Sequence, residues 1–209
     1  PGKVLLLMRS LARNISTMVS LATLGRDVGA VDEALAKNTI SAYYDSLTRL
    51  MVVEDQPAWA PHLRSRSRIR TSPRRHFVDP SLAVAVLRAT PERLLQDLNL
   101  LGFLFESLVI RDLRIYAQAF DAEVLHYKDN TDLEVDAIVE VADGRWAAFE
   151  IKLGTGGVDV GAESLKTFAS RVDTQKAGPP QALGVITGTG VAYTRPDGIS
   201  VIPISVLGP

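Results

Sequence analysis

The sequence predicts a protein of the α/β (α+β) class, with an N-terminal helix-turn-helix unit followed by a part built around a β-hairpin. In the N-terminal part, apolar residues recur at three- and four-residue steps, which is typical of helices. Two stretches between residues 133 and 153 alternate in polarity, which is typical of strands. The chain of 209 residues is 46% hydrophobic and contains no cysteine. This composition indicates a globular protein and excludes disulfide scaffolds and Cys-ligated zinc sites.

Charge divides the chain near Val78. Residues 1–78 carry twelve Lys or Arg against six acids, a net charge of +6, whereas residues 79–209 carry a net charge of −7. Such an asymmetry favours two units with different partners. We therefore predict a winged-helix-like domain at residues 1–78 and a second domain at residues 79–209.

The first domain begins with short helices. A first helix precedes Ser16, which is a candidate cap for a second helix that Gly25 and Gly29 end. A short helix is expected over Asp32–Lys37.

A longer helix from Asn38 to Leu50 follows, with an apolar stripe. The stripe is formed by Ile40, Tyr43, Tyr44, Leu47 and Leu50. A strand-like run from Met51 to Glu54 and a turn at Pro57 complete a helix-turn-helix with a wing. The last helix of such a module can read DNA. A small packing or dimerisation module is the alternative, which the single Arg and single Asp on the polar face of this helix favour.

An arginine strip follows this strand. Its members are Arg64, Arg66, Arg68, Arg70, Arg74 and Arg75. Pro57, Pro61 and Pro73 interrupt the segment, so we expect a loop or wing. Guanidinium groups bind phosphate oxygens, which makes the strip a candidate DNA contact. A solvated linker, or pairing with the acidic second domain, is the alternative.

In the second domain we expect a helix over Ser81–Leu87 and a helical stretch from Pro91 that reaches past Glu106. Glu106 lies in a strongly apolar sequence. A carboxylate there requires a partner, a metal ion or exposure at a cleft.

A β-hairpin is predicted at residues 133–153, and its register follows from the pattern. The odd-numbered residues of both strands, such as Val139 and Phe149, form the apolar faces that we expect to meet the core. Opposed residue numbers must then sum to an even number. A three-residue loop at 142–144 with a left-handed Gly144 satisfies this condition and pairs Val141 with Arg145.

This register brings four charged side chains together. Asp136 lies opposite Glu150, and Glu134 lies opposite Lys152. Facing carboxylates repel each other unless a cation joins them, and Mg²⁺ is the usual hard cation for oxygen ligands. The alternative is a half-exposed hairpin with salt bridges.

These residues resemble the PD-(D/E)xK nuclease fold, in which a helix acid, a strand Asp and a Glu-x-Lys surround metal ions. The whole chain is also similar to the C-terminal half of prokaryotic AAA-type ATP-binding proteins, which join a P-loop ATPase to a winged helix and a nuclease-like domain. The matching motifs are His76-Phe77-Val78-Asp79-Pro80, Gly102-Phe103-Leu104-Phe105-Glu106, Glu134-Val135-Asp136, Glu150-Ile151-Lys152 and Val201-Ile202-Pro203-Ile204.

The resemblance implies a central mixed sheet flanked by helices, including a helix over Ser164–Val172 and strands at Leu183–Thr187 and Ile199–Ile204. It makes a set of four residues the candidate catalytic groups. They are Glu106, Asp136, Glu150 and Lys152. The two strand acids, Asp136 and Glu150, would hold Mg²⁺ or Mn²⁺. The domain would bind DNA and could cleave its phosphodiesters. The alternative is a catalytically silent module of the ATPase that binds DNA or protein and has a regulatory role.

The expected partners are DNA and the ATPase domain of a longer parent protein, and the chain could form oligomers. We expect no ATP binding by this chain, because Ala162 follows the glycine-rich segment Gly154–Gly161 where a phosphate-binding loop requires Lys. That segment is expected to be a mobile connection. The apolar stretches are too short to span a bilayer and no signal peptide is recognisable, so we expect a cytoplasmic protein.

Overall fold

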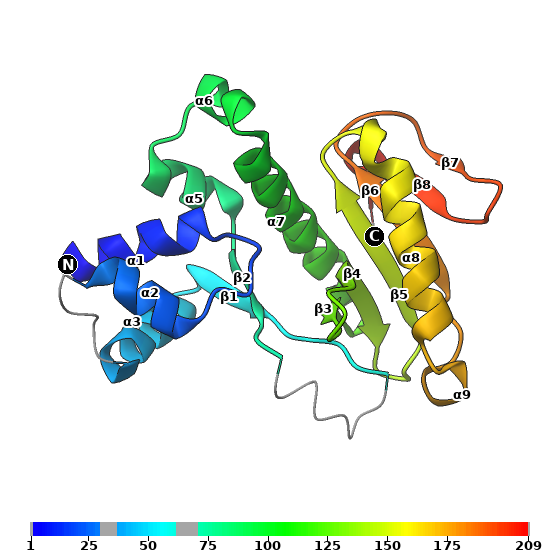
Figure 1. Cartoon of the computed structure of the whole chain (residues 1–209), viewed down its shortest axis with the longest axis horizontal. Helices are drawn as coiled ribbons and strands as arrows, with labels where there is room; N and C mark the ends of the chain where they lie inside the picture. Colours follow the sequence, from blue (N-terminus) through cyan, green and yellow to red (C-terminus); the bar gives the residue numbers. More distant parts are fainter. Residues whose placement is uncertain (1, 30–36, 62–70, 209) are drawn as a thin grey trace. The chain divides into compact units, whose positions relative to one another are not determined.

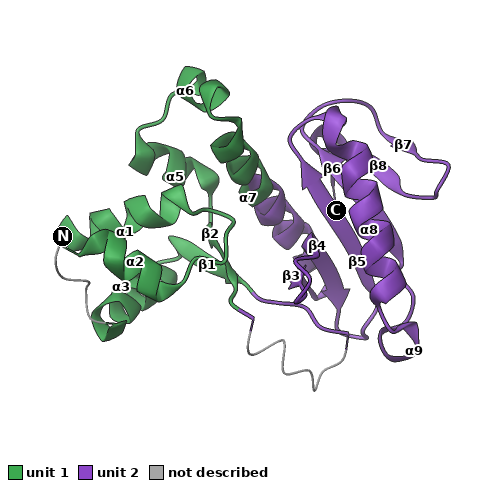
Figure 2. Cartoon of the chain, in the orientation of Figure 1, with its two compact units in different colours: residues 1–56, 72–107 green, residues 57–71, 108–209 purple. Residues whose placement is uncertain are grey.

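The structure is a computed structural model that describes residues 2–29, 37–61 and 71–208. The chain forms two compact units, each assembled from two stretches of sequence (Figure 2). Unit 1 comprises Pro1–Gln56 and Ser72–Ser107, and unit 2 comprises Pro57–Thr71 and Leu108–Pro209. The chain therefore crosses from one unit to the other three times. The predicted domains, by contrast, meet at a single boundary after Val78.

Unit 1 consists of helices and a small hairpin. Together with the mixed sheet of unit 2, it confirms the predicted α/β class. Its helices are α1 (Gly2–Arg13), α2 (Leu21–Val28), α3 (Lys37–Arg49), α5 (Pro80–Leu87), α6 (Pro91–Gln96) and the first part of α7 (Leu98–Ala117) (Figure 1). The predicted stripe of α3 is buried at Ile40, Tyr44 and Leu47, whereas Leu50 lies after the helix and is 72% exposed. Most of the short helix expected at residues 32–37 lies outside the described residues.

The start of α2 differs from the prediction. Ser20, and not Ser16, caps this helix by accepting a hydrogen bond from the Thr23 N–H at 3.1 Å. Ser16 has φ of +61°, and its N–H donates to the Arg75 carbonyl. Gly25 lies within the helix, which ends before Gly29. Both serines precede apolar runs, so the sequence pattern alone does not separate them.

The hairpin of unit 1 pairs β1 (Val53–Gln56) with β2 (Arg74–Phe77) in antiparallel fashion. Of the two expectations for Arg74 and Arg75, a loop is wrong, because both lie in β2, opposite Gln56 and Asp55, whereas a wing allows a hairpin strand. All four residues of β2 are buried. The run has no apolar–polar alternation, which is why the sequence did not predict a strand.

Unit 2 is built on a six-stranded mixed sheet (Figure 1). Its strands are β3 (Ala122–Lys128), β4 (Glu134–Val141), β5 (Trp146–Lys152), β6 (Ala182–Thr187), β7 (Tyr193–Thr194) and β8 (Ser200–Pro203). The spatial order is β3-β4-β5-β6-β8-β7. The strands β3, β4 and β5 form an antiparallel meander, and β6 and β8 continue the sheet parallel to β5.

The predicted register of the β4–β5 hairpin is confirmed. Val139 lies opposite Ala147, and the Val141 N–H donates to the Arg145 carbonyl at 3.0 Å. Gly144 has φ of +87°, the left-handed conformation that a three-residue hairpin loop requires. The alternation of the two strands and one Asp-Gly turn were sufficient to determine this pairing.

Helix α8 (Val158–Arg171) packs on one face of the sheet (Figure 1). This face carries the even-numbered residues of β5. Trp146 and Ala148 are buried there with Leu165 and Phe168, whereas Phe149 on the other face is only half-buried. On the odd-numbered face of β5, Ile151 is buried as expected. The sequence analysis did not predict that the charged, even-numbered face is also covered, because that face carries a Trp and an Ala on which α8 packs.

The helix also begins earlier than the predicted Ser164. Residues Thr155–Gly157 form a 3₁₀ turn, and Gly161 lies inside α8. The glycine-rich segment is therefore structured and not a mobile connection. The later strands expected at residues 183–187 and 199–204 are confirmed as β6 and β8.

The segment before the arginine strip belongs to unit 2 and lies along β3. Ala58 forms a parallel bridge with His126, and the Trp59 N–H donates to the His126 carbonyl at 2.6 Å. The Trp59 ring packs against Trp146 at 5.2 Å and donates from Nε1 to Glu140. These contacts cover the β3 edge of the sheet over this stretch.

None of the helices in the described part of the chain combines the length and apolar character needed to cross a membrane.

Candidate functional site

Three of the predicted site residues come together in unit 2. Lys152 Nζ lies 2.5 Å from Glu150 Oε2 and 3.7 Å from Asp136 Oδ2. Asp136 is on β4, and the other two residues are on β5. We call Asp136, Glu150 and Lys152 the carboxylate–lysine cluster.

The backbone of β5 fixes the side chain of Asp136, which lies near the start of β4. The pairing of β4 with β5 ends at Ala137 and Phe149. Beyond this point, Asp136 Oδ2 accepts a hydrogen bond from the Ile151 N–H at 2.9 Å. A backbone donor of β5 thus holds the carboxylate beside Glu150.

The ion-pair partner of Glu134 is on the other neighbouring strand, and the β4–β5 pairing ends before Glu134. Glu134 lies opposite Lys128 of β3, and their side chains form an ion pair at 2.6 Å. The sequence did not indicate this partner, because β3 carries no clear alternation.

The two carboxylates of the cluster are buried, and the Lys152 side chain is partly exposed. Glu150 is 4% exposed and Asp136 is 9% exposed. Burial, and after it the negative charge of Asp136, raise the pKa of the Glu150 carboxyl from 4.5 to about 7, against the opposing effects of Lys152 and Ser164. A cation at this position therefore relieves a repulsion that the fold itself creates.

Helix α8 contributes a group that the sequence analysis missed. The Ser164 hydroxyl lies 2.9 Å from Glu150 Oε1, so Ser164 and Lys152 contact different oxygens of the same carboxylate. A signal was present in the sequence, since Ser164 is a small polar residue adjacent to the apolar positions of an amphipathic helix. Without knowledge of which sheet face α8 covers, that signal could not be linked to Glu150.

The two carboxylates fit a divalent cation with oxygen ligands. Mg²⁺ commonly binds through one or two carboxylates and completes its coordination with water and substrate phosphate oxygens. Asp136 and Glu150 supply such a pair on one sheet face. Among the described residues, no group of three or more His, Cys, Asp or Glu is arranged to hold a metal ion, so any coordination here would be partly by water or substrate.

Glu106 lies on α7 in unit 1, where it has a protein partner. Its Oε1 is 2.5 Å from Arg74 Nη1, and both side chains are buried. The sequence required a partner, a metal ion or a cleft for this carboxylate, and the structure provides the partner.

Arg74 and Arg75 are buried in unit 1. Arg75 donates to the Val19 carbonyl at 2.9 Å, pairs with Asp55 at 3.1 Å and lies 4.4 Å over the Tyr44 ring. Arg74 is 5% exposed and Arg75 is 8% exposed. The other four predicted DNA contacts, Arg64, Arg66, Arg68 and Arg70, lie outside the described residues.

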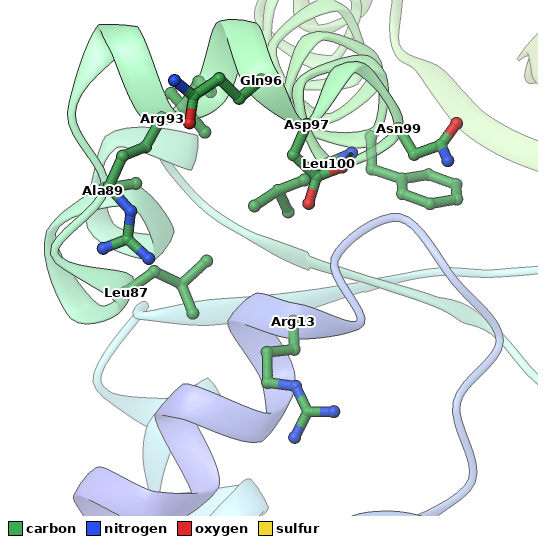
Figure 3. Close-up of a pocket in the computed structure, with 10 residues that line it drawn as sticks. Arg13, Leu87, Ala89, Arg93, Gln96, Asp97, Asn99 and Leu100 are labelled. Carbon is green, nitrogen blue, oxygen red and sulfur yellow. Dashed lines mark hydrogen bonds between the residues drawn. The ribbon is translucent and has the colours of Figure 1, made fainter.

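A separate cavity of about 560 Å³ lies in unit 1 among α1, the α5–α6 connection, α6 and the start of α7 (Figure 3). Arg13 and Arg93 line it together with apolar residues such as Leu100. Its acidic group, Asp97, accepts a hydrogen bond from the Leu100 N–H at the start of α7. None of the predicted site residues lines this cavity.

Comparisons with known proteins identify two domains of unknown function. Residues 1–93 match DUF8612, and residues 101–207 match DUF4143. The second match covers more than half of the chain, and the protein therefore belongs to the DUF4143 family. No curated protein and no solved structure matches the chain.

Proposed function

We propose that unit 2 is a nuclease-like domain that binds DNA phosphodiesters, and hydrolyses them, with Mg²⁺ or Mn²⁺ held by Asp136 and Glu150. The observation that carries the proposal is the carboxylate–lysine cluster, in which two buried acids from neighbouring strands share one lysine. Titratable groups whose pKa is shifted by burial together with a neighbouring charge are concentrated at functional sites.

Each residue of the cluster has a separate task in this proposal. Asp136, oriented by the Ile151 N–H, and Glu150, oriented by its contacts with Lys152 and Ser164, present oxygen ligands. A bound divalent ion would supply the positive charge that stabilises a phosphate group as negative charge develops on it. The Lys152 ammonium has three N–H donors with which it can orient a water molecule next to the phosphate.

The resemblance to PD-(D/E)xK nucleases and to the C-terminal half of AAA-type ATP-binding proteins supports this function. In this chain, helix α7 precedes the meander of β3, β4 and β5, and Glu150-Ile151-Lys152 lies on the last of these strands. The proposal gives no metal ligand role to Glu106, because its carboxylate accepts a hydrogen bond from Arg74. The ATPase domain of a longer parent protein remains the proposed protein partner.

The arginine strip is proposed as the part that contacts the DNA backbone, through Arg64, Arg66, Arg68 and Arg70. Arg74 and Arg75 are left out, because buried guanidinium groups with protein partners do not contact phosphates. Replacing Arg64, Arg66 and Arg68 by Ala should weaken DNA binding and flatten its dependence on salt concentration. An unchanged salt dependence would remove this role.

The test of the metal site is thermal unfolding with and without Mn²⁺. At a hundredfold excess over the dissociation constant, a ligand stabilises the folded state by about 2.7 kcal/mol. We expect Mn²⁺ to raise the melting temperature of the wild type but not of Asp136→Asn. Asp143→Asn is the matched control, because Asp143 lies in the exposed hairpin loop and pairs with Arg145. If Mn²⁺ does not raise the melting temperature of the wild type, the metal site is wrong.

Cleavage is measured on plasmid and linear DNA with Mg²⁺ or Mn²⁺. We expect the wild type to cut and Asp136→Asn and Lys152→Met to be inactive. Metal binding without cleavage on any DNA would exclude the hydrolytic part of the proposal and retain the binding part.

A second candidate function is a catalytically silent binding or regulatory module. The contact of Lys152 Nζ with Glu150, and its 3.7 Å distance from Asp136, favour it, because the lysine neutralises much of the acidic pair without a metal ion. In that case Mn²⁺ should have no effect on unfolding, and Lys152→Met should destabilise unit 2 by leaving the two acids without this cation.

A further inference from the structure

The Glu150 carboxylate is held from two directions. Lys152 contacts Oε2 from the same strand, and the Ser164 hydroxyl contacts Oε1 at 2.9 Å from helix α8. The same hydroxyl lies 3.3 Å from the Glu134 carbonyl of β4. Ser164 therefore links the helix to both strands that carry the acids.

The close approach of α8 to the sheet depends on two glycines. A Cβ at Gly161 would lie 3.2 Å from Glu150 Cβ and 3.3 Å from Lys152 Cε, and a Cβ at Gly157 would lie 3.1 Å from Lys152 Cβ. Gly161 is buried and precedes Ser164 by three residues, so both positions lie on the same helix face. Gly in a helix interior costs about 1 kcal/mol relative to Ala, and here it lets the helix pack directly on the cluster.

We propose that Ser164 is a positioning residue of the metal site, which fixes Glu150 Oε1 so that the carboxylate and Asp136 can bind the same divalent cation. The inference rests on the proposed function of the cluster. Removing the hydroxyl takes away the hydrogen bond to Oε1 while the contact of Oε2 with Lys152 remains, so the carboxylate can rotate about its last torsion towards the ammonium group. Mutation of a group that orients a metal ligand in this way typically weakens metal binding by about 10- to 100-fold.

The test measures Mn²⁺ affinity by the electron paramagnetic resonance signal of free Mn²⁺, on the complete chain. We expect Ser164→Ala to weaken Mn²⁺ binding by roughly 10-fold or more. Ser164→Thr keeps the hydroxyl and should restore affinity to about that of the wild type. Ser170→Ala is the matched control, because Ser170 is an exposed serine of the same helix whose hydroxyl donates to the Thr167 carbonyl.

A second variant approaches the cluster without changing Ser164. Gly161→Ala adds a methyl group against Glu150 and Lys152 and should also weaken Mn²⁺ binding, although alanine favours the helix. Gly156→Ala is its control, since a Cβ there meets nothing within 4 Å. Circular dichroism and melting temperature show whether each variant remains folded.

The outcomes separate the two proposals. Loss of affinity in Ser164→Ala with recovery in Ser164→Thr supports the positioning role. Unchanged Mn²⁺ affinity in Ser164→Ala, or an equal loss in Ser170→Ala, overturns the positioning role while the metal site stands. If the wild type binds no Mn²⁺, the metal site and the positioning role are both overturned.

Discussion

Replacing Glu150 by Gln should stabilise unit 2 at alkaline pH when no divalent ion is present. The folded protein raises the pKa of this carboxyl from 4.5 to about 7, so the folded state binds the proton more tightly than the unfolded state does. Stability should therefore fall as the pH rises from 4.5 through 7 and level off above it. At about 1.4 kcal/mol per pH unit, the full effect is at most about 3.5 kcal/mol.

The net gain of Glu150→Gln will be smaller than this limit. The amide oxygen of Gln can accept a hydrogen bond from Ser164, but the ion pair with Lys152 is lost. We expect a stabilisation of about 1–3 kcal/mol at pH 8 and little change at pH 4.5, where the wild-type carboxyl is largely protonated. For a chain of this size, each kcal/mol corresponds to about 2–4 °C in melting temperature.

Urea unfolding followed by tryptophan fluorescence, in EDTA at pH 4.5, 6 and 8, provides the assay. The chain has two tryptophans, and both Trp59 and Trp146 are buried in the core of unit 2, so their emission reports this unit. Glu163→Gln is the matched control, because Glu163 is an exposed residue of α8 that pairs with Lys166. If Glu150→Gln shows the same dependence of stability on pH as the wild type, the reasoning about the buried carboxylate is refuted.

Three further substitutions test the fold. Trp59→Ala should lower the free energy of unfolding of unit 2 by about 3–5 kcal/mol, because the ring is 2% exposed in an aromatic cluster; a loss under about 1 kcal/mol in thermal unfolding contradicts this packing. Gly144→Ala should cost about 1–2 kcal/mol through its φ of +87°, whereas Gly154→Ala, with no such φ and no nearby atoms, should leave the melting temperature nearly unchanged. Arg74→Met should lower the free energy of unfolding by about 3–5 kcal/mol, because it removes the cation beside buried Glu106. In chemical unfolding, the Arg74→Met/Glu106→Gln double variant should be more stable than Arg74→Met alone. If the losses of the two single variants simply add, the pairing is contradicted.

The hairpin shows how much of this protein could be predicted from local sequence. Alternation in two adjacent strands and a single Asp-Gly turn determine the pairing of Val139 with Ala147 and the left-handed Gly144. The same register places Asp136 next to Glu150. The centre of the candidate site was predictable because its residues are close in sequence and on strands with a clear period of two.

The remaining features depend on contacts between distant parts of the chain. Arg74 and Glu106 are separated by 32 residues, and neither flanking sequence indicates the other as a partner. Ser164 reaches Glu150 only because α8 packs on the charged face of β5. That face carries both charged residues and Trp146, so its pattern alone did not indicate that a helix would cover it.

The two family matches and the two compact units divide the chain in different ways, and this affects how the protein can be cut. A fragment that begins at residue 101, where the DUF4143 match starts, lacks the segment Pro57–Ala60 that lies along β3. It would expose the sheet edge beside His126 and lose Trp59 from the core. During synthesis, too, this segment leaves the ribosome before the strand it pairs with, so unit 2 can complete its sheet only after the rest of unit 1 has been made. Expression trials of unit 2 should therefore retain residues 57–61.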